Sequence, residues 1–347
     1  MAPEARPELR ALRPVAHGGS AEPGQVDFST GISPFAPPPE IIDAARAADP
    51  TRYPHATALP LRDAIAAAQD VDAEHVVAGA GSVELIWTLA RAFAGAGRTG
   101  LVVTPAFGEY EQALRASGAA VVTVRMTAPA FALSTAALDG ALAAHAPAIA
   151  FLCRPSNPCL TSASDDDLAT FARRWPDTLF VVDEAYQPLF EDVAGLAPAS
   201  NVVILRSMTK VFALAGLRLG YLLASRDVAR AVQSALPPWN VSSAAQAAGI
   251  VAARLMSTHL GAIVARVATL RASLAETLST VAGRPAHSGG PFLLYEVGDA
   301  DALCGRLRAR GVTLRSCGSF GLPAYVRVGV RLVPDHAALA RAWAASR

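Results

Sequence analysis

Residues 201–212 read Asn-Val-Val-Ile-Leu-Arg-Ser-Met-Thr-Lys-Val-Phe, and Lys210 in this stretch is the only lysine of the 347-residue chain. Lysine and arginine together number 30, so the other 29 are arginines. An arginine guanidinium stays protonated, whereas a lysine amine can lose its proton and act as a nucleophile. A single lysine in this background indicates a need for an amine. The alternative is a chance survivor on a solvated surface.

The neighbours of Lys210 favour the first interpretation. The apolar run at 201–205 predicts a buried strand, and Ser207 and Lys210 follow at its end. The stretch 216–221 then predicts a turn that carries Arg218. The hydroxyl of Ser207 and the amine of Lys210 are therefore expected near the end of one buried strand, and the guanidinium of Arg218 follows eight residues later. We therefore interpret Lys210 as the residue that carries pyridoxal phosphate.

The composition excludes several classes of protein. Hydrophobic residues make up 52% of the chain, which is too many for a disordered protein. The net charge of +1 and the pI near 7.8 show no excess of basic residues of the kind that nucleic-acid-binding proteins have. The N-terminus does not read as a signal peptide, and the longest uncharged run, 231–253, contains two prolines and is a poor membrane span. We expect a cytoplasmic protein that binds neither nucleic acid nor membrane.

The cysteines show no spacing typical of a metal site. There is no Cys-x-x-Cys pair and no histidine at zinc-binding distance along the chain. We therefore expect no bound metal, and free thiols in a reducing compartment, at Cys153, Cys159, Cys304 and Cys317.

The chain from Tyr53 onward alternates short apolar runs with segments of helical periodicity. The strand candidates are His75–Ala78, Leu101–Thr104, Ala120–Arg125, Ala148–Cys153, Leu179–Asp183, Val202–Ser207 and Arg218–Ala224. This order predicts an α/β fold, with a mainly parallel sheet covered by helices on both faces.

The pattern changes after Pro238. A long helical stretch at 242–278 leads to shorter strands and helices typical of a smaller α+β domain. We therefore divide the chain into three parts. They are an N-terminal arm with part of the small domain (1–50), a large domain (51–238), and a linking helix with the small C-terminal domain (239–347).

Ligands of such sheets bind beyond the carboxyl ends of the strands, and candidate polar residues fall there. Gly81 and Ser82 follow one strand and open a helix, whose backbone amides suit a phosphate. Glu84 stands where a dinucleotide site needs its third glycine, so that class of site is disfavoured. A tight turn that binds nothing remains the alternative.

Three further residues have two interpretations each. Asp183 ends a buried run and needs a partner, either a protonated pyridine nitrogen or the next helix, which it would cap. Phe107 stacks either on a cofactor ring or in the core. Asn157 either donates to a phenolate oxygen or forms an ordinary Asn-Pro turn.

Two arginines, Arg327 and Arg331, lie four residues apart in an apolar run. In a strand, this even spacing places both side chains on one face. Two guanidinium groups there would bind a substrate with two acidic ends. A surface strand with two solvated arginines is the alternative.

The motifs follow one another as Gly-x-Gly-Ser, Pro-x-aromatic, Asn-Pro, Asp-Glu-Ala-Tyr, Ser-x-Thr-Lys and Gly-Leu-Arg-Leu-Gly-Tyr. From His17 to Arg331 the chain resembles the fold-type I pyridoxal-phosphate enzymes, in the subgroup of histidinol-phosphate aminotransferase and threonine-phosphate decarboxylase. The resemblance implies the fold-type I transferase fold, pyridoxal 5'-phosphate as cofactor, and a homodimer with sites at the subunit interface.

The resemblance also implies a role for each motif residue. Lys210 forms the Schiff base and moves protons, and Asp183 pairs with the pyridine nitrogen. The other implied contacts are to the ring oxygen (Asn157, Tyr186), the ring face (Phe107), the cofactor phosphate (Gly81, Ser82, Ser207, Arg218), the phosphate of the neighbouring subunit (Tyr53) and the substrate (His17, Arg327, Arg331).

One departure from the family pattern affects the substrate. Members usually read Asn-x-Asn-Pro, whereas this chain reads Arg154-Pro155-Ser156-Asn157-Pro158. An added cation at Arg154 either binds a substrate phosphate or reshapes the pocket. We therefore include Arg154 among the candidate substrate residues.

The stretches 27–34, 105–110, 238–241 and 315–322 look more like the decarboxylase of cobalamin biosynthesis. The expected reaction is accordingly decarboxylation of L-threonine O-3-phosphate to (R)-1-aminopropan-2-yl phosphate by a lyase. The first alternative is an aminotransferase that acts on histidinol phosphate or a related amino acid. The second is a non-catalytic protein that binds pyridoxal phosphate.

Overall fold

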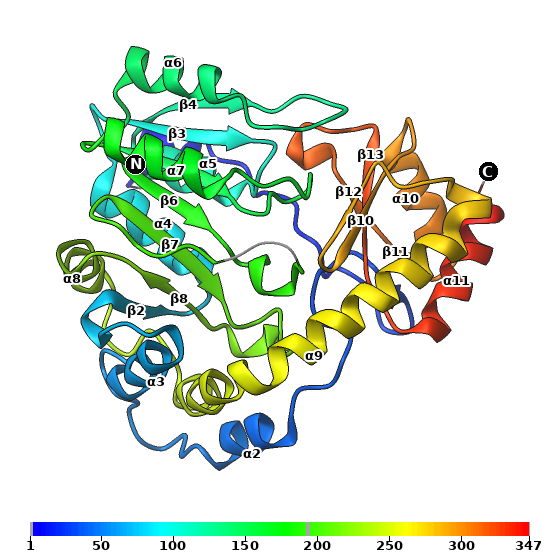
Figure 1. The fold of residues 1–347 in the computed structure, drawn as a ribbon, viewed down its shortest axis with the longest axis horizontal. Helices are drawn as coiled ribbons and strands as arrows, with labels where there is room; N and C mark the ends of the chain where they lie inside the picture. The colour runs from blue at the N-terminus through cyan, green and yellow to red at the C-terminus, as the bar shows by residue number, and fades with distance from the viewer. Residues whose placement is uncertain (1–2, 192–194, 347) are drawn as a thin grey trace.

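The computed structural model describes residues 3–191 and 195–346, and a seven-stranded sheet forms its larger part (Figure 1). In spatial order its strands are β2 (Val76–Gly79), β8 (Gly220–Leu223), β7 (Val202–Ser207), β6 (Leu179–Asp183), β5 (Ile149–Cys153), β3 (Thr99–Thr104) and β4 (Ala120–Arg125). β8 is antiparallel to both its neighbours, and the other pairings are parallel. The predicted α/β fold with a mainly parallel sheet is confirmed.

Two helical layers cover this sheet because successive strand residues point to opposite faces. Val102 and Val181 belong to one apolar core, whereas their neighbours Leu101 and Phe180 belong to the other. The first core is covered by α4 (Ser82–Phe93), α5 (Glu109–Ala116) and α8 (Arg226–Ala235), and the second by α3 (Leu59–Gln69), α6 (Thr135–His145) and α7 (Asp165–Arg174).

Two small sheets lie on the other side of the molecule (Figure 1). A four-stranded antiparallel sheet has the order β12 (Arg315–Ser316), β13 (Tyr325–Gly329), β10 (Phe292–Glu296) and β9 (His287–Gly289). A parallel pair joins β1 (Val26–Asp27) to β11 (Val312–Thr313). β11 and β12 are separated only by Leu314, because the chain leaves one small sheet there and enters the other. A third core packs these sheets against α10 (Ala300–Arg308) and α11 (Val333–Ala344).

The 40-residue helix α9 (Ser243–Ala282) connects the two parts. Near its start Ala248 and Ala252 belong to a core of the large sheet, and near its end Leu274 and Leu278 belong to the core of the small sheets. The start also contacts α2 (Pro39–Ala47) and α3, and the end contacts α11. By length and apolar composition alone, α9 is the one helix among the described residues that could cross a membrane.

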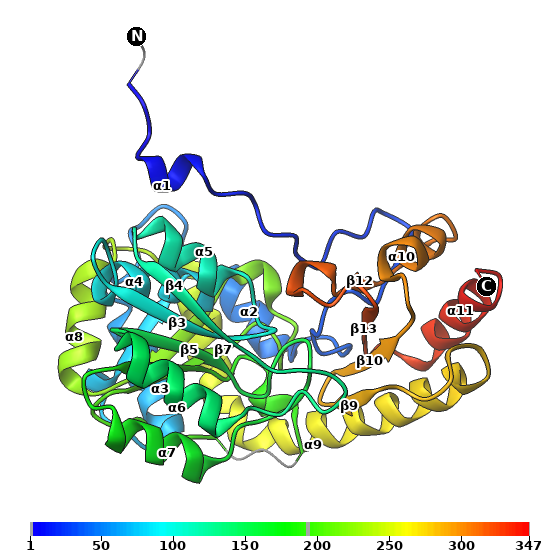
Figure 2. The same ribbon diagram turned by 90° about the horizontal axis from the view of Figure 1, so that it is seen from above.

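The N-terminal arm runs over the outside of the large sheet towards the small sheets (Figure 2). The short helix α1 (Pro7–Arg10) lies against α5, where Arg6 donates to the carbonyl of Ala116 at 2.9 Å. Further on, the carbonyl of Ala16 accepts from Arg315 of β12 at 2.6 Å. The arm thus bridges the two parts before β1 joins the small sheets. The division of the chain at residues 50 and 238 stays a prediction.

The strand directions gather the candidate residues at one sheet edge. β2, β3, β5, β6 and β7 all run the same way, so the segments that follow them leave at a single edge. β8 runs in the opposite direction, which brings Arg218, just before this strand, to the same edge. This edge faces the small sheets.

Candidate active site

A cavity of about 330 Å³ at this edge collects the residues predicted to hold a phosphate, which are Gly81, Ser82, Ser207 and Arg218. Ser82 is the first residue of α4, so backbone amides at the start of that helix face the cavity. Gly81 has φ of +84°, and a Cβ there would lie 2.7 Å from a guanidinium nitrogen of Arg218. Glycine is required here both by the backbone and by the close guanidinium.

Lys210 lines this cavity and the adjoining one. It lies just beyond β7, and its backbone carbonyl accepts from the amide of Ser33 at 2.9 Å. Its amine Nζ lies 5.3 Å from the centroid of the Tyr186 ring. The amine is therefore half-buried at the junction of the two cavities.

Asp183 is buried at the end of β6, and both its carboxyl oxygens accept hydrogen bonds. The backbone amide of Ala185 donates to Oδ1 at 2.8 Å, and the hydroxyl of Tyr110 donates to Oδ2 at 2.7 Å. Burial raises the pKa of Asp183, and the two hydrogen bonds and the Lys210 charge partly oppose this shift. Tyr110 could not be predicted from local sequence, because it lies 73 residues from Asp183 along the chain.

Phe107, Asn157 and Tyr186 line the second cavity, of about 210 Å³, together with Lys210. Phe107 is half-buried, and its ring centroid lies 5.6 Å from that of His17. The amide oxygen Oδ1 of Asn157 accepts a short hydrogen bond from Arg327. The structure thus brings the predicted ring contacts into one place.

Arg327 and Arg315 lie side by side in the second cavity, because β12 and β13 pair with these two residues in register. Arg327 is buried, lies 4.1 Å from the Phe292 ring centroid and donates to the carbonyl of Ser29 at 2.9 Å. Its Nε is buried without a hydrogen-bond partner among the described residues. Arg315 was not among our candidates, since its position beside Arg327 depends on antiparallel pairing.

His17 lies at the boundary of the two cavities and is held by Glu109. Its Nε2 is 3.0 Å from Oε1 of Glu109, and Trp87 donates to Oε2 of the same carboxylate at 2.8 Å. Glu109 is the first residue of α5 and is nearly buried. The structure therefore places His17 beside the cleft and adds Glu109 and Trp87 as its support.

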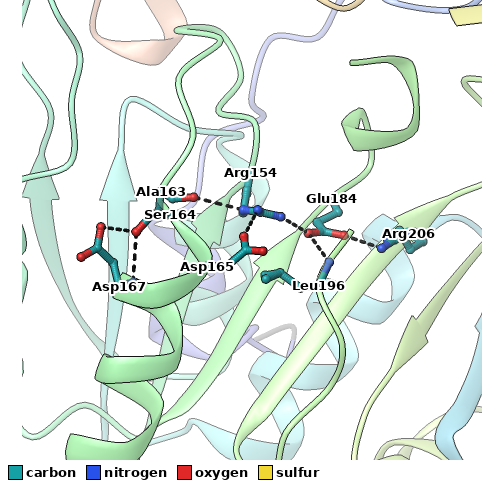
Figure 3. A network of polar contacts seen from close by, with 8 residues as sticks. All are labelled: Arg154, Ala163, Ser164, Asp165, Asp167, Glu184, Leu196 and Arg206. Atoms are coloured by element: carbon teal, nitrogen blue, oxygen red, sulfur yellow. Dashed lines mark hydrogen bonds and ion pairs between the residues drawn. The ribbon is translucent and has the colours of Figure 1, made fainter. Parts of the chain in front are cut away.

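Arg154 lines neither of these two cavities, contrary to the hypothesis that it contacts a substrate phosphate. Figure 3 shows its guanidinium between the carboxylates of Asp165 and Glu184. It is 4% exposed, and it donates to Glu184 at 2.7 Å and forms a short ion pair with Asp165 at the start of α7. Glu184 is fully buried and also pairs with Arg206 at 2.6 Å. Burial raises the pKa of Glu184, and the two arginines oppose that shift. Arg154 joins a buried ion-pair network because a second buried acid follows Asp183.

Two other candidates also lie outside the cleft. β13 ends at Gly329, so Arg331 does not share a strand face with Arg327 but pairs with Asp335 at 3.3 Å. Tyr53 is 82% exposed, and its ring stacks on Trp239 with centroids 4.8 Å apart. Neither residue lines a cavity of the cleft within this chain.

The combination of sheet edge, cleft and lysine defines a fold-type I pyridoxal-phosphate protein. The chain belongs to the family described as aminotransferase class I and II, whose model matches residues 23–344. A histidinol-phosphate aminotransferase of Symbiobacterium thermophilum is 33% identical over 344 residues, covering 94% of this chain and 93% of that protein. Further curated relatives that bear the same name are 32% to 34% identical.

Solved structures show the same fold. A histidinol-phosphate aminotransferase from Sinorhizobium meliloti, in complex with pyridoxal-5'-phosphate, superposes with a TM-score of 0.88 at 22% identity, covering 100% of this chain and 98% of that one. An L-threonine-O-3-phosphate decarboxylase from Porphyromonas gingivalis gives a TM-score of 0.75 at 23% identity, covering 91% and 97%. Both similarities establish the fold alone.

Pyridoxal phosphate is the cofactor of this protein, and the residues present fit it. The glycine turn and Arg218 form a cradle that a Cβ at Gly81 would fill. Asp183 offers a buried carboxylate to a cationic partner, and the charge of Lys210, the one lysine, already acts on this carboxylate.

The comparisons correct the expected reaction. Decarboxylation of threonine phosphate was the leading expectation, yet the curated relatives at about one third identity are histidinol-phosphate aminotransferases. A decarboxylase occurs among the structural neighbours, at an identity that shows only the fold. The expectation of a lyase of cobalamin biosynthesis is therefore wrong, and the aminotransferase alternative is favoured. The torsion angle that separates the two reactions cannot be read from a sequence.

Proposed function

We propose that the protein is an aminotransferase that acts on histidinol phosphate or on a related amino compound with an anionic end. The observation that carries this proposal is the adjacent pair Arg315 and Arg327 in the cavity next to Lys210. Guanidinium groups bind phosphate and carboxylate through two parallel hydrogen bonds. His17, within the same cavity, adds a third group that can carry positive charge. The names of the curated relatives support the phosphate ester as the anionic end.

The cofactor would be held at both ends by residues of the large sheet. Gly81, Ser82, Ser207 and Arg218 would bind its phosphate, and Asp183 would bind its pyridine nitrogen. Asn157 and Tyr186 would contact the ring oxygen, and Phe107 the ring face. When bound, pyridoxal phosphate withdraws electrons from a bond at the substrate carbon that bears the amino group.

The chain's own residues would choose which bond reacts. Arg315 and Arg327 hold the anionic end of the substrate, and this fixes the orientation of the amino-bearing carbon. Lys210 is the only lysine of the chain, and it lines both cavities. Its Nζ would take the proton from that carbon and return it. The N-terminal arm, through Val15 to Gly18, covers the same cavity and limits the access of water.

We also propose a cytoplasmic homodimer in which Tyr53 completes the site of the neighbouring subunit. Support comes from the exposed stack of Tyr53 on Trp239, which lies outside the cleft of its own chain. Mixed dimers of Tyr53→Ala and Lys210→Ala chains would carry one intact site. Activity that appears on mixing the two variants supports sharing, and a mixture as inactive as its components contradicts it.

The test of function is a pair of incubations with purified protein. Histidinol phosphate plus 2-oxoglutarate should produce glutamate, and threonine phosphate should release no carbon dioxide. Arg315→Met and Arg327→Met should each raise the Michaelis constant for histidinol phosphate by at least about 10-fold, since a charged hydrogen bond is worth roughly 1.5–3 kcal/mol. Carbon dioxide release without glutamate would overturn the proposal.

A further inference from the structure

Tyr110 contacts Asp183 and lines neither of the two cavities of the cleft. Its side chain is fully buried on α5, and its hydroxyl donates to Oδ2 of Asp183 at 2.7 Å. The ring stacks almost parallel on Phe151 of β5, with an interplanar angle of 5° and centroids 5.2 Å apart. A second ring, Phe107, meets it edge-on with centroids 5.8 Å apart. Packing on two sides therefore fixes the direction in which the hydroxyl points.

This contact helps to orient Asp183 and favours its ionised form. The amide of Ala185 fixes Oδ1, and Tyr110 fixes Oδ2, so the carboxylate plane cannot rotate without loss of a hydrogen bond. A buried carboxylate favours its neutral form unless donors or cations compensate. The remaining titratable groups near Asp183 are Cys153, its neighbour on β5, and Lys210. Tyr110 is thus one of only two hydrogen-bond donors that the described residues offer this carboxylate.

A protonated pyridine nitrogen needs an ionised acid at a fixed place, because a neutral acid cannot hold the extra proton on the ring. We propose that Tyr110 is a positioning residue that keeps Asp183 ionised and aimed at the cofactor nitrogen. The tyrosine touches neither cofactor nor substrate and acts only through the aspartate. This inference rests on the cofactor and not on the proposed substrate, so it survives if the amino substrate is a different one.

A purely structural role for Tyr110 makes a different prediction. Tyr110→Phe keeps the ring, its stack on Phe151 and its edge contact with Phe107, and removes only the hydroxyl. If the residue served the core alone, this variant would bind pyridoxal phosphate as the unchanged protein does. If it acts through Asp183, the variant loses cofactor affinity while the fold persists.

The experiment titrates cofactor-free protein with pyridoxal phosphate and measures the dissociation constant and the pH dependence of the bound cofactor's absorbance. We expect Tyr110→Phe to raise the dissociation constant by about 10- to 100-fold, from the worth of a hydrogen bond to a charged group. The absorbance transition of the protonated ring should move to lower pH. The control is Tyr295→Phe, which removes a hydroxyl from a buried tyrosine in the core of the small sheets.

A double-mutant cycle separates action through Asp183 from any other cause. Asp183→Asn removes the carboxylate, so adding Tyr110→Phe to it should change the dissociation constant by less than about 2-fold. The same large loss in both backgrounds would overturn the inference, and so would a single variant with unchanged affinity and absorbance. No amino substrate enters these measurements, so their outcome is independent of whether glutamate is formed in the transamination assay.

Discussion

Replacement of Arg154 by methionine should destabilise the protein strongly without changing its substrate affinity. The Arg154 side chain is 5% exposed, and that of its partner Glu184 is 0% exposed. Methionine fills the apolar part of the space but leaves the buried Glu184 with one cationic partner, Arg206, in place of two. Removal of one member of a buried ion pair costs about 3–5 kcal/mol, because the remaining charge stays desolvated. We therefore expect the free energy of unfolding to fall by roughly 3 kcal/mol or more.

The assay is urea denaturation at saturating pyridoxal phosphate, followed by circular dichroism. The matched control is Arg226→Ala, whose ion pair with Asp72 at 2.8 Å has side chains 59% and 68% exposed. An exposed pair of this kind contributes about 0.2–1 kcal/mol, so the control should change stability little. A loss below about 1 kcal/mol for Arg154→Met would refute the reasoning from burial. An unchanged stability with a raised Michaelis constant would restore the substrate-contact hypothesis.

Three further predictions concern the cofactor site. Gly81→Ala should weaken pyridoxal phosphate binding, because φ of +84° strains a side chain by about 1–3 kcal/mol and the new Cβ would meet Arg218 at 2.7 Å. Gly140→Ala, at an open position inside α6, is the control and should instead stabilise the protein by about 0.5–1 kcal/mol in thermal denaturation. Lys210→Arg should abolish the covalent label that borohydride leaves on a peptide spanning position 210; a label that persists there would exclude Lys210 as the attachment site. In the cofactor-free protein, burial raises the pKa of Asp183 above its ordinary value of 3.8, so between these two values the folded chain binds more protons than the unfolded chain. The free energy of unfolding should therefore decrease as pH rises from about 4 through the raised pKa, and Asp183→Asn should flatten that slope in urea denaturation; an equal slope in both proteins would contradict the shift.

Residues whose role depends on local order could be predicted from the sequence. Lys210 was recognisable as the only lysine, Asp183 as the last residue of an apolar strand, and Gly81 as a residue just after one. The alternation of strands and helices was enough for the α/β fold, since strand and helix periodicities differ. These features need only neighbours along the chain.

Residues whose role depends on distant partners could not be predicted. Arg315 reaches the cleft because β12 pairs with β13, and a sequence does not state that register. We interpreted Arg154 as a substrate contact because its neighbours in the sequence do not indicate its buried partner. That partner, Glu184, lies 30 residues further along the chain. We expected Arg331 to point inward because the apolar run continues past Gly329. The strand β13 ends at Gly329, however, and tertiary packing rather than local sequence sets that end.

The helix α9 has a consequence for the way this molecule can move and melt. Forty residues at 1.5 Å each make a rod of about 60 Å, and its two halves are anchored in separate apolar cores. Because α9 contributes side chains to both cores, unfolding of one core should weaken the other, so thermal unfolding should be cooperative across the two cores. Any movement of the small sheets away from the large sheet should likewise require α9 to bend, because this helix packs against both.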